Sequence, residues 1–394
     1  MKPREIRPGI HTVGAIHWDA RLFDALIPLP DGTSYNSYLI RGSEKTVLID
    51  TVDPAMAGTL THSLDQMGVS NIDYVVANHA EQDHSGSIPL VLGKYPGAKI
   101  VTNTRCKGML IDLLMIPEDK VITVEDRETL SLGDRALEFI FTPWVHWPET
   151  ISTYLKEEKI LFSCDFFGAH LATTELYVAD EWMVFQAAKR YFAEIMMPFR
   201  TSIQRNLEKL KDYDIDIIAP SHGPLYDRPG FIIEAYRDWV FGEPKNIVVL
   251  PYVTMHGSTY QMVEYLTEAM VQKGIIVKPF DMRVTDSGKL AMALVDAATL
   301  VLGAPTMLAG SHPSIAYAAF LVNALRPKLK FFSIIGSYGW VPGTREQLTG
   351  MLSGLKAEFL EPVFSKGIPK ETEYAALDDL SETIAQKHRE NGCI

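Results

Sequence analysis

The chain has 394 residues, with 37 Lys and Arg against 49 Asp and Glu, which gives a formal net charge of −12. This length predicts two or three domains, and 47% hydrophobic and 22% charged residues are ordinary for folded globular proteins. The acidic balance without a basic block argues against nucleic acid and anionic membranes as partners, and no apolar run approaches the ~20 residues of a membrane helix.

The first part of the chain mixes short apolar strands with amphipathic helices. A mixed α/β layered fold is predicted from this alternation. Strands are expected at residues 35–40, 46–50, 73–77, 99–102, 137–141, 151–155 and 159–162, and helices at 54–67, 87–95, 104–114, 198–211 and 229–241.

A short polar junction at residues 241–245 precedes a different pattern. Five strands then alternate strictly with helices, which predicts a doubly wound parallel sheet of flavodoxin type. The strands are expected at 246–251, 275–279, 299–302, 330–335 and 358–362, and the helices at 258–272, 289–295, 313–325, 344–354 and 374–390. We therefore predict a domain at 1–245, with net charge −11, and a domain at 246–394, with net charge −1.

The three cysteines, Cys106, Cys164 and Cys393, are too few and too widely spaced for a disulfide framework or a CxxC metal site. Together with an N-terminus that lacks the apolar segment of a secretory signal, they predict a reducing, cytoplasmic compartment. Any metal site must rely on histidines and carboxylates, and any iron–sulfur donor must be another protein.

The densest chemical feature is the segment HAEQDH, which follows the apolar strand at 73–77. Loops at strand ends are where such folds place functional residues. Further candidates each follow an apolar strand-like run, so the whole set is expected to converge on one rim. The candidate metal ligands are His79, Glu81, Asp83, His84, His146, Asp165 and His222.

A single histidine such as His222 is more often a packed or surface residue than a ligand, and His11, His17, His62 and His388 are interpreted that way. Four possible ligands within six residues are not explained by a solvated loop. Seven ligands suit two metals with one bridging carboxylate. Zinc hydrolases favour histidine, whereas added carboxylates favour iron or manganese, so Glu81 tilts the prediction toward iron.

The set resembles the metallo-β-lactamase fold, whose zinc members carry HxHxDH followed by His, Asp and His at similar strand ends. Here Glu81 replaces the second His, and this HxExDH variant, with the stretches TPWVHWPET and SCDFFGAH, resembles the flavodiiron proteins. The resemblance implies a four-layer αββα domain followed by the flavodoxin-like domain.

The resemblance also implies how the ligands are shared between the irons. One iron would take His79, Glu81 and His146, the other Asp83, His84 and His222, and Asp165 would bridge them. The family's FGQH stretch has Ala169 in place of Gln here, and the retained His170 is expected either to support the ligands or to pack.

Three segments of the second domain predict FMN binding. Small hydroxyl residues and glycine at a helix start offer a phosphate free N–H groups without a lysine, and an aromatic pair beside glycines offers a surface for the flavin ring. In flavodoxin strand order these segments meet at one switch point, and all three resemble the FMN loops of flavodiiron proteins. The candidate residues are Thr254, Met255, His256, Gly257, Ser258, Thr259, Pro305, Thr306, Met307, Gly336, Ser337, Tyr338, Gly339 and Trp340.

The resemblance implies a diiron and FMN oxidoreductase that reduces dioxygen to water, nitric oxide to nitrous oxide, or both. It also implies a head-to-tail homodimer or dimer of dimers, and an external electron donor, either rubredoxin or a reduced deazaflavin coenzyme. Two alternatives stay open from the residues: a zinc or diiron hydrolase of metallo-β-lactamase type with a flavodoxin module, and a non-enzymatic electron carrier.

Overall fold

The computed structural model describes residues 2–393, and contacts divide the chain into two compact units. Unit 1 comprises the chain up to Phe192 together with Phe199–Val240, and unit 2 comprises Ala193–Pro198 together with Phe241–Ile394. The domain boundary expected after residue 245 stays a prediction. Within residues 2–393, no helix is both long and apolar enough to cross a membrane.

Unit 1 contains two sheets. The first has strand order β1-β2-β7-β8-β9-β10-β11, and the second β12-β13-β14-β15-β16. The first consists of β1 (Arg4–Arg7), β2 (Ile10–Thr12), β7 (Tyr38–Arg41), β8 (Thr46–Ile49), β9 (Tyr74–Val76), β10 (Lys99–Thr102) and β11 (Val121–Thr123), and the second of β12 (Thr129–Ser131), β13 (Ala136–Phe141), β14 (Ile151–Leu155), β15 (Ile160–Cys164) and β16 (Ile217–Pro220). Two small hairpin-like pairs accompany them: β3 (Ala15–His17) with β6 (Thr33–Tyr35), and β4 (Leu22–Phe23) with β5 (Ile27–Pro28).

The central strands of the first sheet, β7 to β10, are mostly buried, and their alternate side chains face opposite layers. Ile40 and Val47 belong to a core cluster that also contains Phe139 and Phe162 of the second sheet, so this cluster fills the space between the sheets. Fully burying such a side chain stabilises a fold by roughly 1.5–3 kcal/mol.

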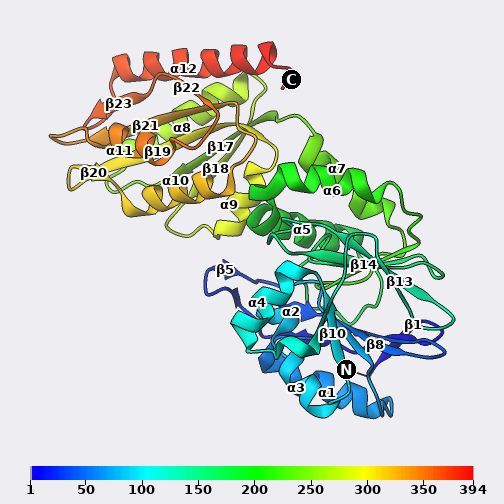
Figure 1. Cartoon of the computed structure of the whole chain (residues 1–394). Coiled ribbons are helices and arrows are strands. Elements are labelled where there is room, and N and C mark those ends of the chain that lie inside the picture. The colour runs from blue at the N-terminus through cyan, green and yellow to red at the C-terminus, as the bar shows by residue number, and fades with distance from the viewer. Residues whose placement is uncertain (1, 394) are drawn as a thin grey trace. The chain divides into compact units, whose positions relative to one another are not determined.

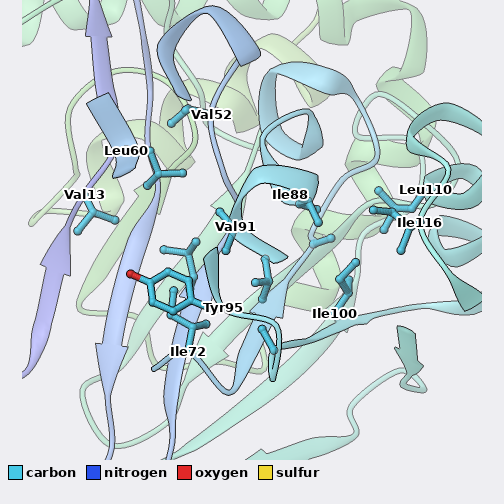
Figure 2. Packing of buried hydrophobic residues seen from close by; sticks show 14 of the residues in the cluster. Val13, Val52, Leu60, Ile72, Ile88, Val91, Tyr95, Ile100, Leu110 and Ile116 are labelled. Carbon is cyan, nitrogen blue, oxygen red and sulfur yellow. The ribbon is translucent and has the colours of Figure 1, made fainter. Parts of the chain in front are cut away.

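The other face of the first sheet is covered by helices. Leu60 of α1 and Val91 of α3 share a cluster with Ile72 and Ile100, as Figure 2 shows. On the far side of the second sheet, Lys209 of α6 donates to the carbonyl of Phe141 at 2.8 Å. The helices are α1 (Ala57–Gln66), α2 (Gln82–Ser85), α3 (Ile88–Lys94), α4 (Thr104–Leu114), α5 (Glu181–Tyr191), α6 (Arg200–Leu210) and α7 (Gly230–Phe241).

The order helix, sheet, sheet, helix is therefore the predicted four-layer αββα arrangement, and Figure 1 shows these layers in unit 1. The sequence prediction missed α2, α5, β11, β12 and the short strands before residue 35, and the strand predicted at 35–40 covers the end of β6 and most of β7. It also merged the 3-10 turn Pro54–Met56 with α1, and Asp53 caps that turn by accepting from the Ala55 N–H.

Unit 2 has a parallel sheet in the order β18-β17-β19-β21-β22, with β20 paired to β19 and β23 paired to β21. This is the strand order of flavodoxin-like folds. Its strands are β17 (Lys245–Tyr252), β18 (Ile276–Asp281), β19 (Ala297–Met307), β20 (Gly310–Ser311), β21 (Phe331–Tyr338), β22 (Glu358–Phe359) and β23 (Val363–Lys366), and its helices α8 (Ser258–Gln272), α9 (Ser287–Leu294), α10 (Pro313–Leu325), α11 (Thr344–Met351) and α12 (Glu371–Glu390). The predicted fold class is confirmed for both parts of the chain.

Two details of unit 2 differ from the sequence prediction. The single strand expected at 358–362 is split into β22 and β23. Residues 303–307 and 336–338, expected as loops, are the last residues of β19 and β21, because the register Thr299↔Phe331 continues to Pro305↔Ser337. Glycine and proline suggested loops there, but the parallel ladder extends through them.

Candidate metal centre

All seven predicted ligands lie at one edge of the sandwich in unit 1. His79 and Glu81 follow β9, and α2 carries Asp83 and His84. The other three are His146 in the β13–β14 connection, Asp165 directly after β15 and His222, the second residue after β16. The carboxyl ends of strands from both sheets thus meet at this edge, which is why ligands 143 residues apart in the sequence come together.

The first group of ligand atoms surrounds one point. Glu81 Oε2 lies 3.1 Å from His79 Nε2 and 3.0 Å from His146 Nε2, and Asp165 Oδ2 lies 3.5 Å from both histidine nitrogens. Metal–ligand bonds of about 2.0–2.2 Å place neighbouring ligand atoms roughly 3.0–3.5 Å apart. The spacing therefore fits a single ion.

The second group uses the other oxygen of the same carboxylate. Asp165 Oδ1 lies 3.1 Å from His84 Nε2 and 3.3 Å from His222 Nε2. Asp83 presents Oδ1 to His84 at 3.2 Å and Oδ2 to His222 at 3.3 Å. Asp165 thus faces both groups at once, one oxygen to each, which is the geometry of a bridging carboxylate.

Several of these buried atoms lack a hydrogen-bond partner although they lie close together. Asp83 Oδ1 and Oδ2, His84 Nε2 and Asp165 Oδ2 are in this state within the described residues. Buried polar groups normally form hydrogen bonds. When the lone pairs of several such atoms point to one place without forming hydrogen bonds, the arrangement indicates a binding site for a cation. The donor set of four histidines and three carboxylates fits two iron ions.

Without metal, the histidines are strongly basic. Burial lowers their pKa, but the neighbouring carboxylates outweigh it: Asp165 and Glu81 raise the pKa of His146 to about 9, and Asp165 and Asp83 raise that of His222 to about 10. Burial raises the pKa of Glu81, yet His146 and His79 lower it below its usual range overall. Protons therefore occupy the positions that cations take, and metal binding must release them.

The ligand loops are fixed by side chains that the sequence prediction did not single out. Asp50 accepts from the N–H of Asn78 at 2.8 Å and from its Nδ2 at 2.9 Å. Thr51 donates to the carbonyl of His84 through its N–H at 2.7 Å and through Oγ1 at 2.6 Å. These bonds hold the segment from Asn78 to His84 at both ends.

Three further neighbours of the ligands were also missed. Glu149 lies 2.7 Å from His79 Nδ1, the carbonyl of Ser34 accepts from His222 Nδ1 at 2.6 Å, and Tyr191 Oη donates to Asp165 Oδ1 at 2.8 Å. Glu149 lies inside the TPWVHWPET stretch, close to His146 in the sequence. That proximity to a predicted ligand could have identified it as a neighbour of the site. Tyr191 lies on α5, which the sequence prediction missed, and Ser34 contributes only its backbone.

His170, whose role the sequence left undecided, packs beside the second group. Its ring lies 4.8 Å from those of His222 and Tyr191, and its Nδ1 is 2.9 Å from Thr33 Oγ1. Burial and the nearby His222 lower the pKa of His170 far below its ordinary value, so the ring is neutral. The His170 ring therefore packs beside the ligand His222 and belongs to neither ligand group.

A cavity of about 350 Å³ opens onto the metal centre. Glu81 and Asp83, one carboxylate from each group, line it together with Phe23, Asp24 and Trp147. Burial, followed by the charges of Glu81 and Asp83, raises the pKa of Asp24. The space suits a small molecule next to both groups, and its wall holds a carboxyl group that is a weaker acid than usual.

The candidate FMN residues lie at the carboxyl ends of β17, β19 and β21 in unit 2. Gly257 has φ +90° and precedes α8, and the loop is closed by its N–H, which donates to Thr254 Oγ1 at 3.0 Å. A side chain at Gly257 would meet no atom within 4 Å, so this helix N-terminus is open to a phosphate.

Hydroxyl groups link the first candidate segment to the third, and the second to the start of α11. Thr259 Oγ1 lies 2.9 Å from Ser337 Oγ, and Thr306 Oγ1 lies 2.8 Å from Thr344 Oγ1. Trp340 is 81% exposed beside this edge, so its indole is free to cover a flat ring. The segments at 254–259 and 336–340 therefore have the open helix end and the aromatic surface that FMN needs, and the candidate residues remain predictions.

Comparisons with known proteins agree with this architecture. A family model described as "ODP family beta lactamase" matches residues 33–223. The chain is 34% identical to a nitric oxide reductase of Moorella thermoacetica, over 91% of this chain and 92% of that protein. It is 31% identical to a coenzyme F420H2 oxidase of Methanothermobacter marburgensis, over 88% of this chain and 89% of that protein.

Solved structures match over almost the whole length. The rubredoxin oxygen:oxidoreductase of Desulfovibrio gigas superposes with a TM-score of 0.95 at 30% identity, covering 100% of both chains. The flavodiiron protein of Giardia intestinalis superposes with a TM-score of 0.92 at 28% identity, covering 98% of this chain and 97% of that chain.

Proposed function

The chain belongs to the flavodiiron proteins, and we propose that its seven clustered side chains hold the two irons with which it reduces dioxygen, nitric oxide or both. The observation that carries this assignment is Asp165, whose two oxygens face the two ligand groups separately. When bound, the irons deliver electrons to the gas and FMN collects those electrons from a donor.

The chain's own residues prepare that site in three ways. Asp83, His84 and Asp165 are buried, so their charges act in a medium from which water is excluded. Tyr191 donates to Asp165 and fixes the carboxylate between the two groups. The 350 Å³ cavity leaves room for the gas beside Glu81 and Asp83.

Both reductions consume protons, and Asp24 is placed to supply them. It lines the cavity, and although the residue is exposed, partial burial of its carboxyl group and then the charges of Glu81 and Asp83 raise its pKa above the ordinary value. We assign Asp24 the role of passing protons from solvent into the cavity.

We propose that FMN binds at the carboxyl edge of the unit 2 sheet. Its phosphate would lie at the open N-terminus of α8, beside Gly257 and Ser258, and its ring beside Trp340. Electrons come from outside the chain, because its three cysteines are all free and buried and form no iron–sulfur site. Rubredoxin and a reduced deazaflavin coenzyme are the donor classes to which the relatives' names point.

We also propose a head-to-tail homodimer, alone or paired into a dimer of dimers. Exposed apolar side chains line the cavity of unit 1, with Leu22 58% and Leu113 42% exposed. The candidate FMN edge of unit 2 exposes Leu308 at 89% as well as Trp340. Apolar surface of this kind marks interaction sites, and two copies would cover both faces while bringing FMN of one to the irons of the other. The reduced cysteines favour a cytoplasmic location.

Metal and flavin analysis of the purified protein, with gas consumption, tests the function. We expect two irons and one FMN per chain, and consumption of dioxygen or nitric oxide when reduced rubredoxin or reduced deazaflavin is added anaerobically. Stoichiometric zinc with thioester or lactam hydrolysis, and no gas consumption, would point instead to a hydrolase. Light scattering at several protein concentrations tests the dimer.

A further inference from the structure

One ligand histidine in each group has its Nδ1, the ring nitrogen that faces away from the metal position, bonded to a different kind of partner. His79 Nδ1 lies 2.7 Å from Glu149 Oε1, whereas His222 Nδ1 lies 2.6 Å from the carbonyl oxygen of Ser34. Both partners accept, so each ring carries its hydrogen on Nδ1 and turns Nε2 toward the metal. The partner of His79 is a carboxylate, and that of His222 is a neutral peptide group.

Glu149 is itself rigidly placed. Its side chain is 0% exposed, and the N–H of Ala80, next to His79 in the chain, donates to the same Oε1 at 3.1 Å. Its backbone carbonyl accepts from Asn103 Nδ2 at 2.5 Å, and Asn103 in turn caps α4 by accepting from the N–H of Cys106. The carboxylate is therefore bonded to the ligand loop through Oε1, and the backbone of Glu149 is bonded to the residue that caps α4, whereas Oε2 has no hydrogen-bond partner among the described residues.

Glu149 is outside both ligand groups. The groups of atoms close enough to share an ion contain His79, Glu81, His146 and Asp165 on one side but exclude Glu149, which touches the opposite nitrogen of the His79 ring. Asp50, another buried carboxylate near the ligands, gives its oxygens to the N–H and Nδ2 of Asn78 and contacts no ligand ring through a hydrogen bond. Glu149 is thus the carboxylate that reaches a ligand ring from outside the cluster.

We propose that Glu149 is a positioning residue for the diiron centre, which fixes the His79 ring and places a negative charge behind the iron held by His79, Glu81 and His146. The proposal rests on the proposed function, because it concerns iron at that site. A carboxylate behind a metal-binding histidine makes the ring a stronger donor, which favours the higher charge of the metal. The iron on this group is therefore harder to reduce than it would be behind a neutral partner.

Two substitutions separate position from charge. Glu149→Gln keeps the shape and an oxygen that accepts from His79 Nδ1 and the Ala80 N–H, but removes the charge. Glu149→Ala removes both. The matched control is Glu138→Gln on β13, a largely buried carboxylate of the same unit that is paired with Lys156 at 2.8 Å and accepts from Tyr213 at 2.6 Å.

The measurements are iron content, the rate of iron release from the reduced holoenzyme to a chelator, and a reductive titration of the diiron centre followed by electron paramagnetic resonance. We expect Glu149→Gln to keep both irons and to shift one reduction step to a more positive potential. Glu149→Ala should release one iron about 10–100-fold faster, the usual cost of losing an outer partner. Glu138→Gln should match the wild type in all three.

Unchanged reduction steps in Glu149→Gln would overturn the role of the charge, and wild-type iron release from Glu149→Ala would overturn the role in positioning. If Glu149→Ala does not fold, the potentials of Glu149→Gln decide alone. A wild-type protein that binds no iron would overturn the proposed function and this inference together, whereas an iron-loaded wild type with insensitive variants overturns only the inference.

Discussion

The two cofactor regions of this chain are built on opposite plans. The metal centre in unit 1 consists of buried charged side chains from distant segments, each bonded to a specific partner, such as Asp165 to Tyr191 and His79 to Glu149. The candidate FMN edge of unit 2 consists of strand ends, a helix N-terminus and small hydroxyl groups, with Trp340 in solvent. A cation needs charges at fixed points, whereas a large flavin gathers many weak contacts.

The difference implies that single substitutions act strongly in unit 1 and weakly in unit 2. A buried carboxylate that faces two metals has no substitute nearby, because its neighbours are already ligands. A hydroxyl at the FMN edge shares its task with several others. The following predictions, from the largest effect to the smallest, test how far this contrast holds.

Removal of the shared carboxylate is expected to have the largest effect. Asp165→Ala deprives both ligand groups of an oxygen, and it should abolish binding of at least one iron and lower gas reduction by about 100-fold or more, beyond the cost of losing an outer partner. Iron content and gas consumption measure this. Asp65→Ala, which removes only an exposed pair with Lys94, is the control and should keep both irons. Wild-type iron content in Asp165→Ala would contradict the bridging role of Asp165.

The stability of the metal-free chain should depend on pH in a way that the iron-loaded chain does not. The folded pKa values of His146 and His222, about 9 and 10, lie above the ordinary 6.5. Raised pKa values stabilise the fold below about pH 6.5, and this contribution is lost as the pH rises through 9 to 10.

Urea unfolding between pH 6 and 10 measures that dependence. The free energy of unfolding of the metal-free chain should fall by several kcal/mol, on the order of 1.4 kcal/mol per pKa unit, as the pH rises. Iron replaces the protons in the loaded chain, so its stability should vary much less over the same range. Parallel curves for the two forms would contradict the proton–metal exchange.

A glycine substitution in unit 2 tests whether the backbone of the candidate FMN edge tolerates an added side chain. A Cβ on Gly336 would come within 2.1 Å of the Ala304 carbonyl oxygen on the neighbouring strand. Gly336→Ala should therefore lower the free energy of unfolding by about 1–3 kcal/mol, the range for overpacking. Gly339→Ala is the control, because a Cβ there meets no atom within 4 Å.

Thermal unfolding of both glycine variants, each loaded with FMN, measures the effect. If Gly339→Ala loses as much stability as Gly336→Ala, the sheet contact is not the reason for the glycine. In that case direct contact with the flavin would explain both positions better.

The smallest effect is expected for a single hydroxyl at the FMN edge. Thr259→Val removes the bond to Ser337 and the hydroxyl proposed to contact FMN, and since one hydrogen bond contributes about 0.5–1.5 kcal/mol, FMN should bind about 2–10-fold more weakly. Fluorescence titration of the FMN-free chain measures this, with Thr349→Val on the exposed side of α11 as control. A loss of 1000-fold would show that unit 2 depends on single side chains as unit 1 does.

Much of the site could be predicted from the sequence because its signals are local. The HAEQDH segment follows an apolar strand, and four possible metal ligands within six residues need a chemical reason. Glu81 distinguishes the set from an all-histidine zinc site. The alternation of five strands with helices after residue 245 predicted the parallel sheet, since such alternation has few other solutions.

Other parts could not be predicted because they depend on contacts between distant segments. Glu149 meets His79 across 70 positions, and the Ser34 carbonyl meets His222 across 188. Neither contact leaves a pattern in the residues between them. The strands β19 and β21 continue through Gly303, Pro305 and Gly336, where composition suggested loops, because the paired neighbour fixes their conformation.

The sequence by itself determined most of the helices and strands and the identity of the seven candidate ligands, since hydrophobic periodicity and the spacing of ligand residues can be read directly from the chain. Only the tertiary structure decided that Asp165 divides its oxygens between two groups and that a carboxylate stands behind one ligand ring while a peptide carbonyl stands behind another. The reason is physical: which atoms share a point in space follows from how the two sheets pack, and packing is set by the whole core rather than by any segment of it.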